Sequence, residues 1–134
     1  MSILRIISFG YFIALLIAAS LNYIPGLTDD QGLAFGIFAL DPYDDALHLA
    51  SALWALTAVI MGARACTIFL VIFGALYLGD GVFGIFTGYG YLDLAIFTNP
   101  SAGMSFTLVR FLANLPHIAM GAFALWSGLR WWKV

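Results

Sequence analysis

The fold of this chain is decided by residues Ala46–Phe86, "ALHLASALWALTAVIMGARACTIFLVIFGALYLGDGVFGIF". Arg64 and Asp80 are its only charged residues. Each apolar half is long enough to cross roughly 30 Å of hydrocarbon as a helix that rises about 1.5 Å per residue. Backbone polar groups in lipid must be paired within the segment, so the two halves should be helices and not strands. The stretch therefore predicts two consecutive transmembrane helices joined near Arg64.

The rest of the chain has the same character. Of its 134 residues 63% are hydrophobic and 9% are charged, whereas about a quarter of the residues of a soluble domain are charged. We expect four spans: about Ile3 to Ile24, near Asp45 to near Ala63, about Ala65 to about Phe86, and a fourth that ends at about Leu129. The predicted architecture is an all-α membrane protein, with residues 1–134 forming a single four-transmembrane-helix bundle.

The basic residues indicate the orientation of the four spans. Four of them fall at span ends that share one face if both termini lie inside, namely Arg5, Arg64, Arg130 and Lys133, and only Arg110 departs from this pattern. The two long loops of the other face carry most of the aspartates. By the positive-inside rule, we expect both termini to be cytoplasmic. The expected location is a bacterial inner membrane.

Several classes of function have no support in the sequence. The net charge of −2 and the five basic residues are too little positive charge for nucleic-acid binding. Cys66 is the only cysteine, so no internal disulfide can form. Hydrolase, zinc-protease and phosphate-loop motifs are missing, so we expect neither an enzyme nor a metal site. The expected partners are membrane lipids and either other integral membrane subunits or further copies of the chain.

Two similar elements carry the two histidines. Asp45-x-x-His48 and Asn114-x-x-His117 each precede an apolar helix, and each follows a short apolar loop segment, at 33–40 and 104–113. This pattern predicts a two-fold internal repeat, helices 1–2 and helices 3–4, about an axis along the membrane normal. In one interpretation Asp45 and Asn114 are N-cap residues.

That interpretation has consequences for the neighbouring residues. Pro116 would lie in a first helical turn, where proline is tolerated. The segment 104–113 would then be a separate interfacial helix. Asp41 and Asp44 would be solvated loop charges.

Depth along the spans predicts one polar layer in the outer part of the bundle. His48 and Asp80 are each sixteen residues from Arg64, which corresponds to roughly 24–26 Å in a straight helix. A carboxylate such as Asp80 costs roughly 2.5–3.5 kcal/mol in a span, so it requires a partner or a proton. The expected polar cluster consists of Asn22, Asp45, His48, Asp80, Arg110, Asn114 and His117.

The third predicted span is rich in glycine. Gly74, Gly79, Gly84 and Gly88 follow small-residue spacings that let helices approach closely. They are expected to pack helices within the bundle, or alternatively against another protein.

Three functional hypotheses follow from these residues. The first is a non-enzymatic accessory or structural subunit that packs against a larger membrane complex. The second is a protein that binds haem b or another pigment between His48 and His117, since imidazoles on facing helices are suitable axial ligands. The third is a small proton- or ion-linked transporter centred on Asp80, with histidines that titrate near neutral pH.

Three segments resemble a known family: "LNYIPGL" at 21–27, "DPYDDALHLASALWAL" at 41–56 and "NLPHIAMGAFAL" at 114–125. They are similar to a bacterial family of small four-helix integral membrane proteins of unknown function. Its Asn/Asp-x-x-His-Leu motif begins helices 2 and 4 and corresponds here to Asp45 with His48 and to Asn114 with His117. Pro116 departs from that pattern. The resemblance implies a four-helix membrane fold and no activity.

Overall fold

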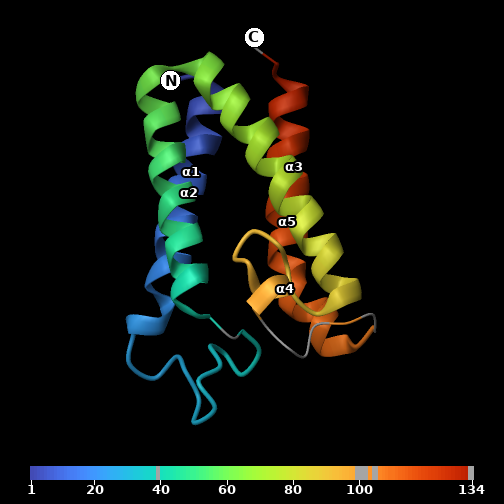
Figure 1. Ribbon diagram of the computed structural model, residues 1–134. Helices are drawn as coiled ribbons and strands as arrows, with labels where there is room; N and C mark the ends of the chain where they lie inside the picture. The colour runs from blue at the N-terminus through green and yellow to red at the C-terminus, as the bar shows by residue number, and fades with distance from the viewer. Residues whose placement is uncertain (39, 99–102, 104–105, 133–134) are drawn as a thin grey trace.

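The computed structural model describes residues 1–38, 40–98, 103 and 106–132. Its elements are α1 (Ile3–Ser20), the 3-10 turn η1 (Leu21–Tyr23), α2 (Pro42–Met61), α3 (Ala63–Thr87), α4 (Ala95–Thr98) and α5 (Leu108–Arg130) (Figure 1). The described residues form no strand beyond isolated bridges in the first long loop. Four segments, the α1–η1 segment, α2, α3 and α5, are long and apolar enough to cross a membrane. The predicted four-helix membrane bundle is confirmed.

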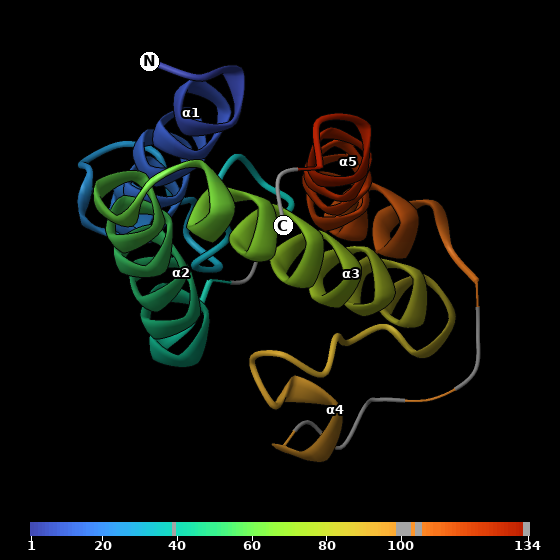
Figure 2. The ribbon, with the colours of Figure 1, turned by 90° about the horizontal axis from the view of Figure 1, so that it is seen from above.

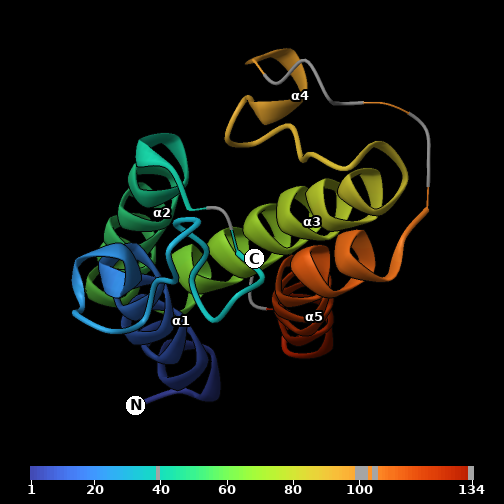
Figure 3. The ribbon, with the colours of Figure 1, turned by 90° about the horizontal axis from the view of Figure 1, so that it is seen from below.

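The four long helices form two antiparallel hairpins. α1 packs on α2 and α3 packs more extensively on α5, while the hairpins meet mainly where α2 contacts α3 (Figures 1 and 2). The α2–α3 connection and both ends of the described chain lie at one end of the bundle, and the two long loops lie at the other (Figure 1). Figures 2 and 3 show α4 and α5 on opposite sides of α3. The internal repeat itself stays a prediction.

Both predicted N-caps were wrong. The N-cap of α2 is Asp41, four residues before the predicted cap Asp45. Asp41 Oδ1 accepts the backbone N–H groups of Tyr43 and Asp44, and the Asp44 carboxylate accepts the N–H of Asp41 in return. This reciprocal pair is a capping box, followed by Pro42 at the first helical position. Asp45 therefore lies within the first turn of α2 and does not cap it.

The start of α5 differs in the same direction. Thr107 caps the helix by accepting the N–H of Arg110, so Asn114 lies well inside α5 and Pro116 is an interior proline. Residues Leu108 to Ala113 belong to α5 and not to a separate interfacial helix, while Met104 and Ser105 of that segment lie outside the described residues. The helix continues through Pro116, which has no N–H to donate, and it packs extensively on α3.

Glycines bring α3 and α5 into backbone contact. A Cβ atom at Gly74 would overlap the backbone of Leu125, and one at Gly121 would overlap the backbone of Leu78. The other three predicted packing glycines make room for side chains: a Cβ would meet Tyr91 at Gly79, Asn114 at Gly84 and Arg110 at Gly88. Gly88 also ends α3 with a positive φ of 88°, which favours glycine. The glycine-rich face of α3 is therefore covered from within the chain.

An aromatic column runs through the core toward the loop end. Phe69, Phe73 and Tyr77 lie on one face of α3, with the Phe73 and Tyr77 rings stacked at a centroid distance of 4.0 Å. Tyr11 of α1 packs edge-on against Phe73 and donates a hydrogen bond from its hydroxyl to the carbonyl of Met120 in α5. This column joins the hairpins and supports the polar residues at its outer end.

Candidate functional site: a polar cavity at the loop end of the bundle

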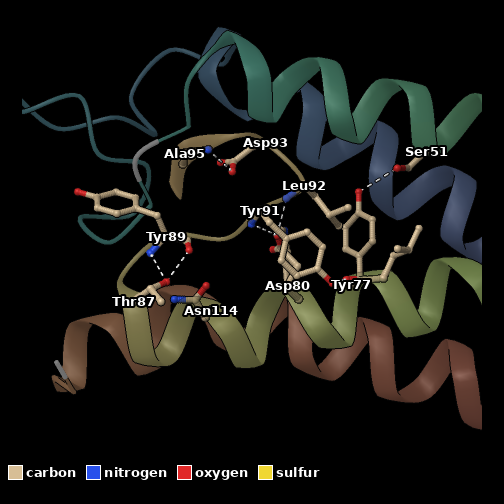
Figure 4. Close-up of polar contacts among 12 residues, drawn as sticks. Ser51, Tyr77, Asp80, Thr87, Tyr89, Tyr91, Leu92, Asp93, Ala95 and Asn114 are labelled. Carbon is tan, nitrogen blue, oxygen red and sulfur yellow. Dashed lines mark hydrogen bonds and ion pairs between the residues drawn. The ribbon is translucent and has the colours of Figure 1, made fainter. Parts of the chain in front are cut away.

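Asp80 is the centre of the polar residues. The residue is 3% exposed, and Oδ1 accepts the backbone N–H groups of Tyr91 and Leu92, both at 2.8 Å (Figure 4). Oδ2 lies 2.6 Å from Nδ1 of His117 in α5. Both carboxylate oxygens of Asp80 are therefore engaged. A buried carboxylate requires a partner, and Asp80 has two: His117 and the loop after α3.

The contact with Asp80 orients the His117 ring. In the neutral imidazole Nδ1–H donates to the carboxylate, and Nε2 is then left as an acceptor. Tyr77 packs on the same ring at a centroid distance of 4.9 Å, and the Tyr77 hydroxyl is 2.9 Å from the hydroxyl of Ser51 in α2. A continuous set of contacts from Ser51 to Asp80 thus ties α2, α3 and α5 together around His117.

His48 lies beside His117 and has an unsatisfied nitrogen. The two imidazole rings are 5.8 Å apart between centroids and nearly perpendicular, at 86°. His48 is 7% exposed, and its Nδ1 has no hydrogen-bond partner among the described residues. A buried polar atom without a partner is costly, so this position is suited to a bound polar group.

These residues line a cavity of about 390 Å³ between the two hairpins at the loop end. Its wall contains five members of the predicted polar cluster: His48, Asp80, Arg110, Asn114 and His117. The other lining residues come from α1, α2, α5 and both long loops: Ala18, Leu21, Ile37, Phe38, Leu40, Asp44, Gly88, Tyr89, Gly90, Asp93, Val109, Ala113, Pro116 and Met120. The cavity is therefore mostly apolar, with polar groups from each half of the chain.

Asn22 and Asp45 do not line this cavity. The Asn22 amide donates to the carbonyl of Leu40 and to Oδ2 of Asp45, at 3.4 Å in the second case. The predicted single layer is therefore divided in two, because Asn22 lies in η1 and reaches the start of α2 instead of turning into the bundle. Asn114 remains at the cavity, where its amide donates to the carbonyl of Arg110.

Sequence reasoning missed two acids of the site. Asp44 was expected to be a solvated loop charge, but it is only 9% exposed and lies within hydrogen-bonding reach of the Asp93 carboxyl group. Both line the cavity. The pattern Asp41-Pro-x-Asp44 is a capping-box signature that could have placed Asp44 in the helix. No comparable signal marks Asp93, which comes from the loop that Asp80 holds.

A second cavity of about 200 Å³ adjoins the first. It shares Leu40, Asp44, Tyr89 and Asp93 with the first cavity and is also lined by Gly32, Asp41 and Ala95. Since these residues belong to the long loops and the start of α2, the acidic end of the main cavity continues toward the loop surface.

Tyr91 closes the loop over α3. Its hydroxyl donates to the carbonyl of Leu76, 2.8 Å away, and burial together with the charge of Asp80 raises the pKa of the phenol above its ordinary value. The hydroxyl is therefore a lasting donor at neutral pH, and it helps Asp80 to hold the loop in place.

Within the described part of the chain, no group of three or more His, Cys, Asp or Glu side chains could hold a metal ion. A haem would have His48 and His117 available as ligands, on α2 and α5. The comparisons add no relative: no protein-family model, no curated protein and no solved structure matches this chain.

Proposed function

We propose that this chain is a non-enzymatic integral membrane protein that binds a small amphipathic molecule in the cavity between its two hairpins. The observation that supports this most is the position of His48. A nine-tenths buried imidazole with an unsatisfied nitrogen lines a cavity of about 390 Å³ next to the fixed His117. Small-molecule sites have volumes of about 300–1,000 Å³, mostly apolar walls and a few convergent polar groups.

The apolar wall favours a ligand that arrives from the lipid. Val109, Ala113, Pro116 and Met120 of α5 and Leu21 after α1 form one side of the cavity, and α1 and α5 make few contacts with one another. An apolar molecule would enter between these helices on the loop side of Tyr11, which donates to the Met120 carbonyl. Its polar end would meet the histidines and acids.

Native mass spectrometry of the protein released from mild detergent tests the proposal, with Ala113→Phe and Ala119→Phe as a matched pair. Ala113 lines the cavity, whereas Ala119 is exposed on the same helix. The wild type and Ala119→Phe are expected to carry a small-molecule adduct that Ala113→Phe loses. An adduct that persists equally in all three proteins, or no adduct in any of them after growth in rich medium, would contradict binding in this cavity.

A haem or another pigment is the specific alternative that the pair of histidines favours. The imidazole rings of α2 and α5 are 5.8 Å apart between centroids, and as axial ligands they would have to hold the haem iron between them. An absorption spectrum of protein purified from cells supplied with iron and a haem precursor decides between them. A Soret band that disappears in His48→Ala and in His117→Ala would replace the proposed ligand by haem b, and a colourless protein would remove this alternative.

The accessory-subunit and transporter hypotheses have less support from the geometry. The glycines that suggested packing on another subunit contact residues of the same chain, such as Leu125 and Asn114. Both oxygens of Asp80, the centre of the supposed ion path, are engaged by His117 and the loop. Co-purification of a second membrane protein in stoichiometric amount would restore the first hypothesis, and flux into liposomes that Asp80→Asn abolishes would restore the second.

A further inference from the structure

The acidic end of the cavity contains two neighbouring carboxyl groups, those of Asp44 and Asp93. Asp44 and Asp93 lie within hydrogen-bonding reach of each other, and both line the two adjoining cavities. The Asp44 carboxylate accepts the Asp41 N–H at 3.2 Å, and the Asp93 carboxylate accepts the Ala95 N–H at 3.1 Å. Two carboxylates this close repel unless they share a proton or hold a cation.

The charges of the main cavity are unbalanced in the same direction. Because both oxygens of Asp80 are engaged, the carboxylates left for a ligand are those of Asp44 and Asp93, against one guanidinium from Arg110. His117 contacts Asp80 through Nδ1, and the Arg110 guanidinium donates to the carbonyl of Gly103 at 2.8 Å. A positively charged ligand would therefore complement the cavity, and an anion would add to the repulsion.

His48 provides an independent observation, an unpaired buried polar group at the same cavity. It is nine-tenths buried, lines the same cavity as Asp44 and has no partner at Nδ1. In the tautomer that carries its proton on Nε2, this nitrogen is an acceptor. Asp44, Asp93 and His48 together offer three acceptors, and a primary ammonium has three donors.

We infer that the ligand is a primary organic ammonium with an apolar body; this inference rests on the proposed function. Its –NH₃⁺ group lies at Asp44 and Asp93 with His48 as a further acceptor, and its apolar body occupies the side of the cavity formed by Val109, Ala113 and Met120. On binding, the ammonium compensates the charge of the two carboxyl groups, and any proton that they share in the free protein is released to water. The ligand enters from the outer region of the lipid or from the loop surface through the second cavity.

Calorimetric titration of the purified protein in nanodiscs with three probes of equal chain length tests the charge: n-hexylammonium, n-hexanol and n-hexanoate. The wild type is expected to bind hexylammonium saturably and at least ten-fold more tightly than hexanol, with no measurable binding of hexanoate. Asp93→Asn and Asp44→Asn are expected to weaken hexylammonium binding at least ten-fold, because asparagine keeps the acceptor oxygen but not the charge. Asp30→Asn, an exposed loop aspartate outside both cavities, is the control for loss of charge and should bind as the wild type does.

The outcomes separate the ligand class from the proposed function. Hexanol or hexanoate binding that matches hexylammonium and is lost in Ala113→Phe would overturn the ammonium assignment but keep the cavity as a binding site. If Ala113→Phe still binds every probe, or if all variants bind equally, both the ammonium assignment and the proposed function are overturned. A parallel titration with Ca²⁺ alone covers an inorganic cation: saturable Ca²⁺ binding that Asp93→Asn removes, without hexylammonium binding, would also overturn the assignment. Unchanged melting temperatures of the Asn variants establish that they fold.

Discussion

At the scale of single residues, Asp80 illustrates what a carboxylate does when a span buries it. Its insertion cost requires a partner, and three candidates were available in the sequence: His48, His117 and Arg110. The structure pairs it with His117 and adds two backbone N–H groups from the loop at Tyr91 and Leu92. Asp80 therefore positions His117 and the loop, and its charge is not available to a ligand.

Asp80→Ala is expected to lower the free energy of unfolding by about 3 kcal/mol, because it leaves two backbone donors and a histidine without their partner in a buried place. Asp80→Asn should cost less, since the amide oxygen can still accept both N–H groups. Reversible unfolding in mixed detergent measures the difference, with the exposed Asp30→Ala as a control that stays within about 0.5 kcal/mol of wild type. Equal stability of Asp80→Ala and wild type would contradict the role of Asp80 as a clamp.

At the scale of elements, the α3–α5 pair depends on glycine for its close approach. Gly74 and Gly121 face each other across the pair, and a side chain at either would overlap the backbone of the opposite helix. Membrane helices gain little from the hydrophobic effect when they associate, so close van der Waals packing of this kind is a major part of their stability. The same pair holds Asp80 opposite His117, so this packing also sets the geometry of the cavity.

Gly74→Ala should therefore lower the free energy of unfolding by about 1–3 kcal/mol through overpacking. The matched control is Gly10→Ala in α1, where a Cβ has no atom within 4 Å; its stability should be unchanged or raised by up to about 1 kcal/mol. Both variants are compared by detergent-induced unfolding. A cost for Gly10→Ala as large as that for Gly74→Ala would show that the loss at Gly74 does not come from its contact with α5.

At the scale of the whole molecule, the hairpin arrangement places both ends of the described chain at one end of the bundle and the cavity at the other (Figure 1). The basic residues Arg5, Arg64 and Arg130 belong to the end with the termini, whereas Asp44, Asp80 and Asp93 line the cavity at the loop end. We propose on the positive-inside rule that the termini face the cytoplasm of a bacterial inner membrane and that the cavity lies toward the outer face.

Fusions of two reporters test this orientation in a bacterial host. Green fluorescent protein at the C-terminus should fluoresce, because it folds in the cytoplasm, and alkaline phosphatase inserted after Gln31 in the first long loop should be active, because it requires export. Exchanging the two reporters is the control and should give two inactive fusions. The opposite pattern would place the cavity on the cytoplasmic side.

The sequence by itself determined the class of the protein and the number and approximate bounds of its spans. These follow from local properties: an apolar run of sufficient length must satisfy its backbone as a helix in lipid, wherever the other helices lie. It also identified Asp80 and the two histidines, because polar side chains in such runs are few. The N-caps Asp41 and Thr107 were missed because the caps were assigned to Asp45 and Asn114, which lie three residues before each histidine.

Only the tertiary structure decided which polar residues meet. Depth along straight helices placed Asn22 in the same layer as His48, and the predicted polar cluster also included Asp45. Depth, however, contains no information about the side of the helix that faces the bundle. Packing of α3 on α5 through Gly74 and Gly121 turned His117 toward Asp80. The loop held by Asp80 carries Asp93 to Asp44, more than forty residues away in the chain. A contact between distant segments depends on the whole set of packing interactions, so no single stretch of the sequence could predict it.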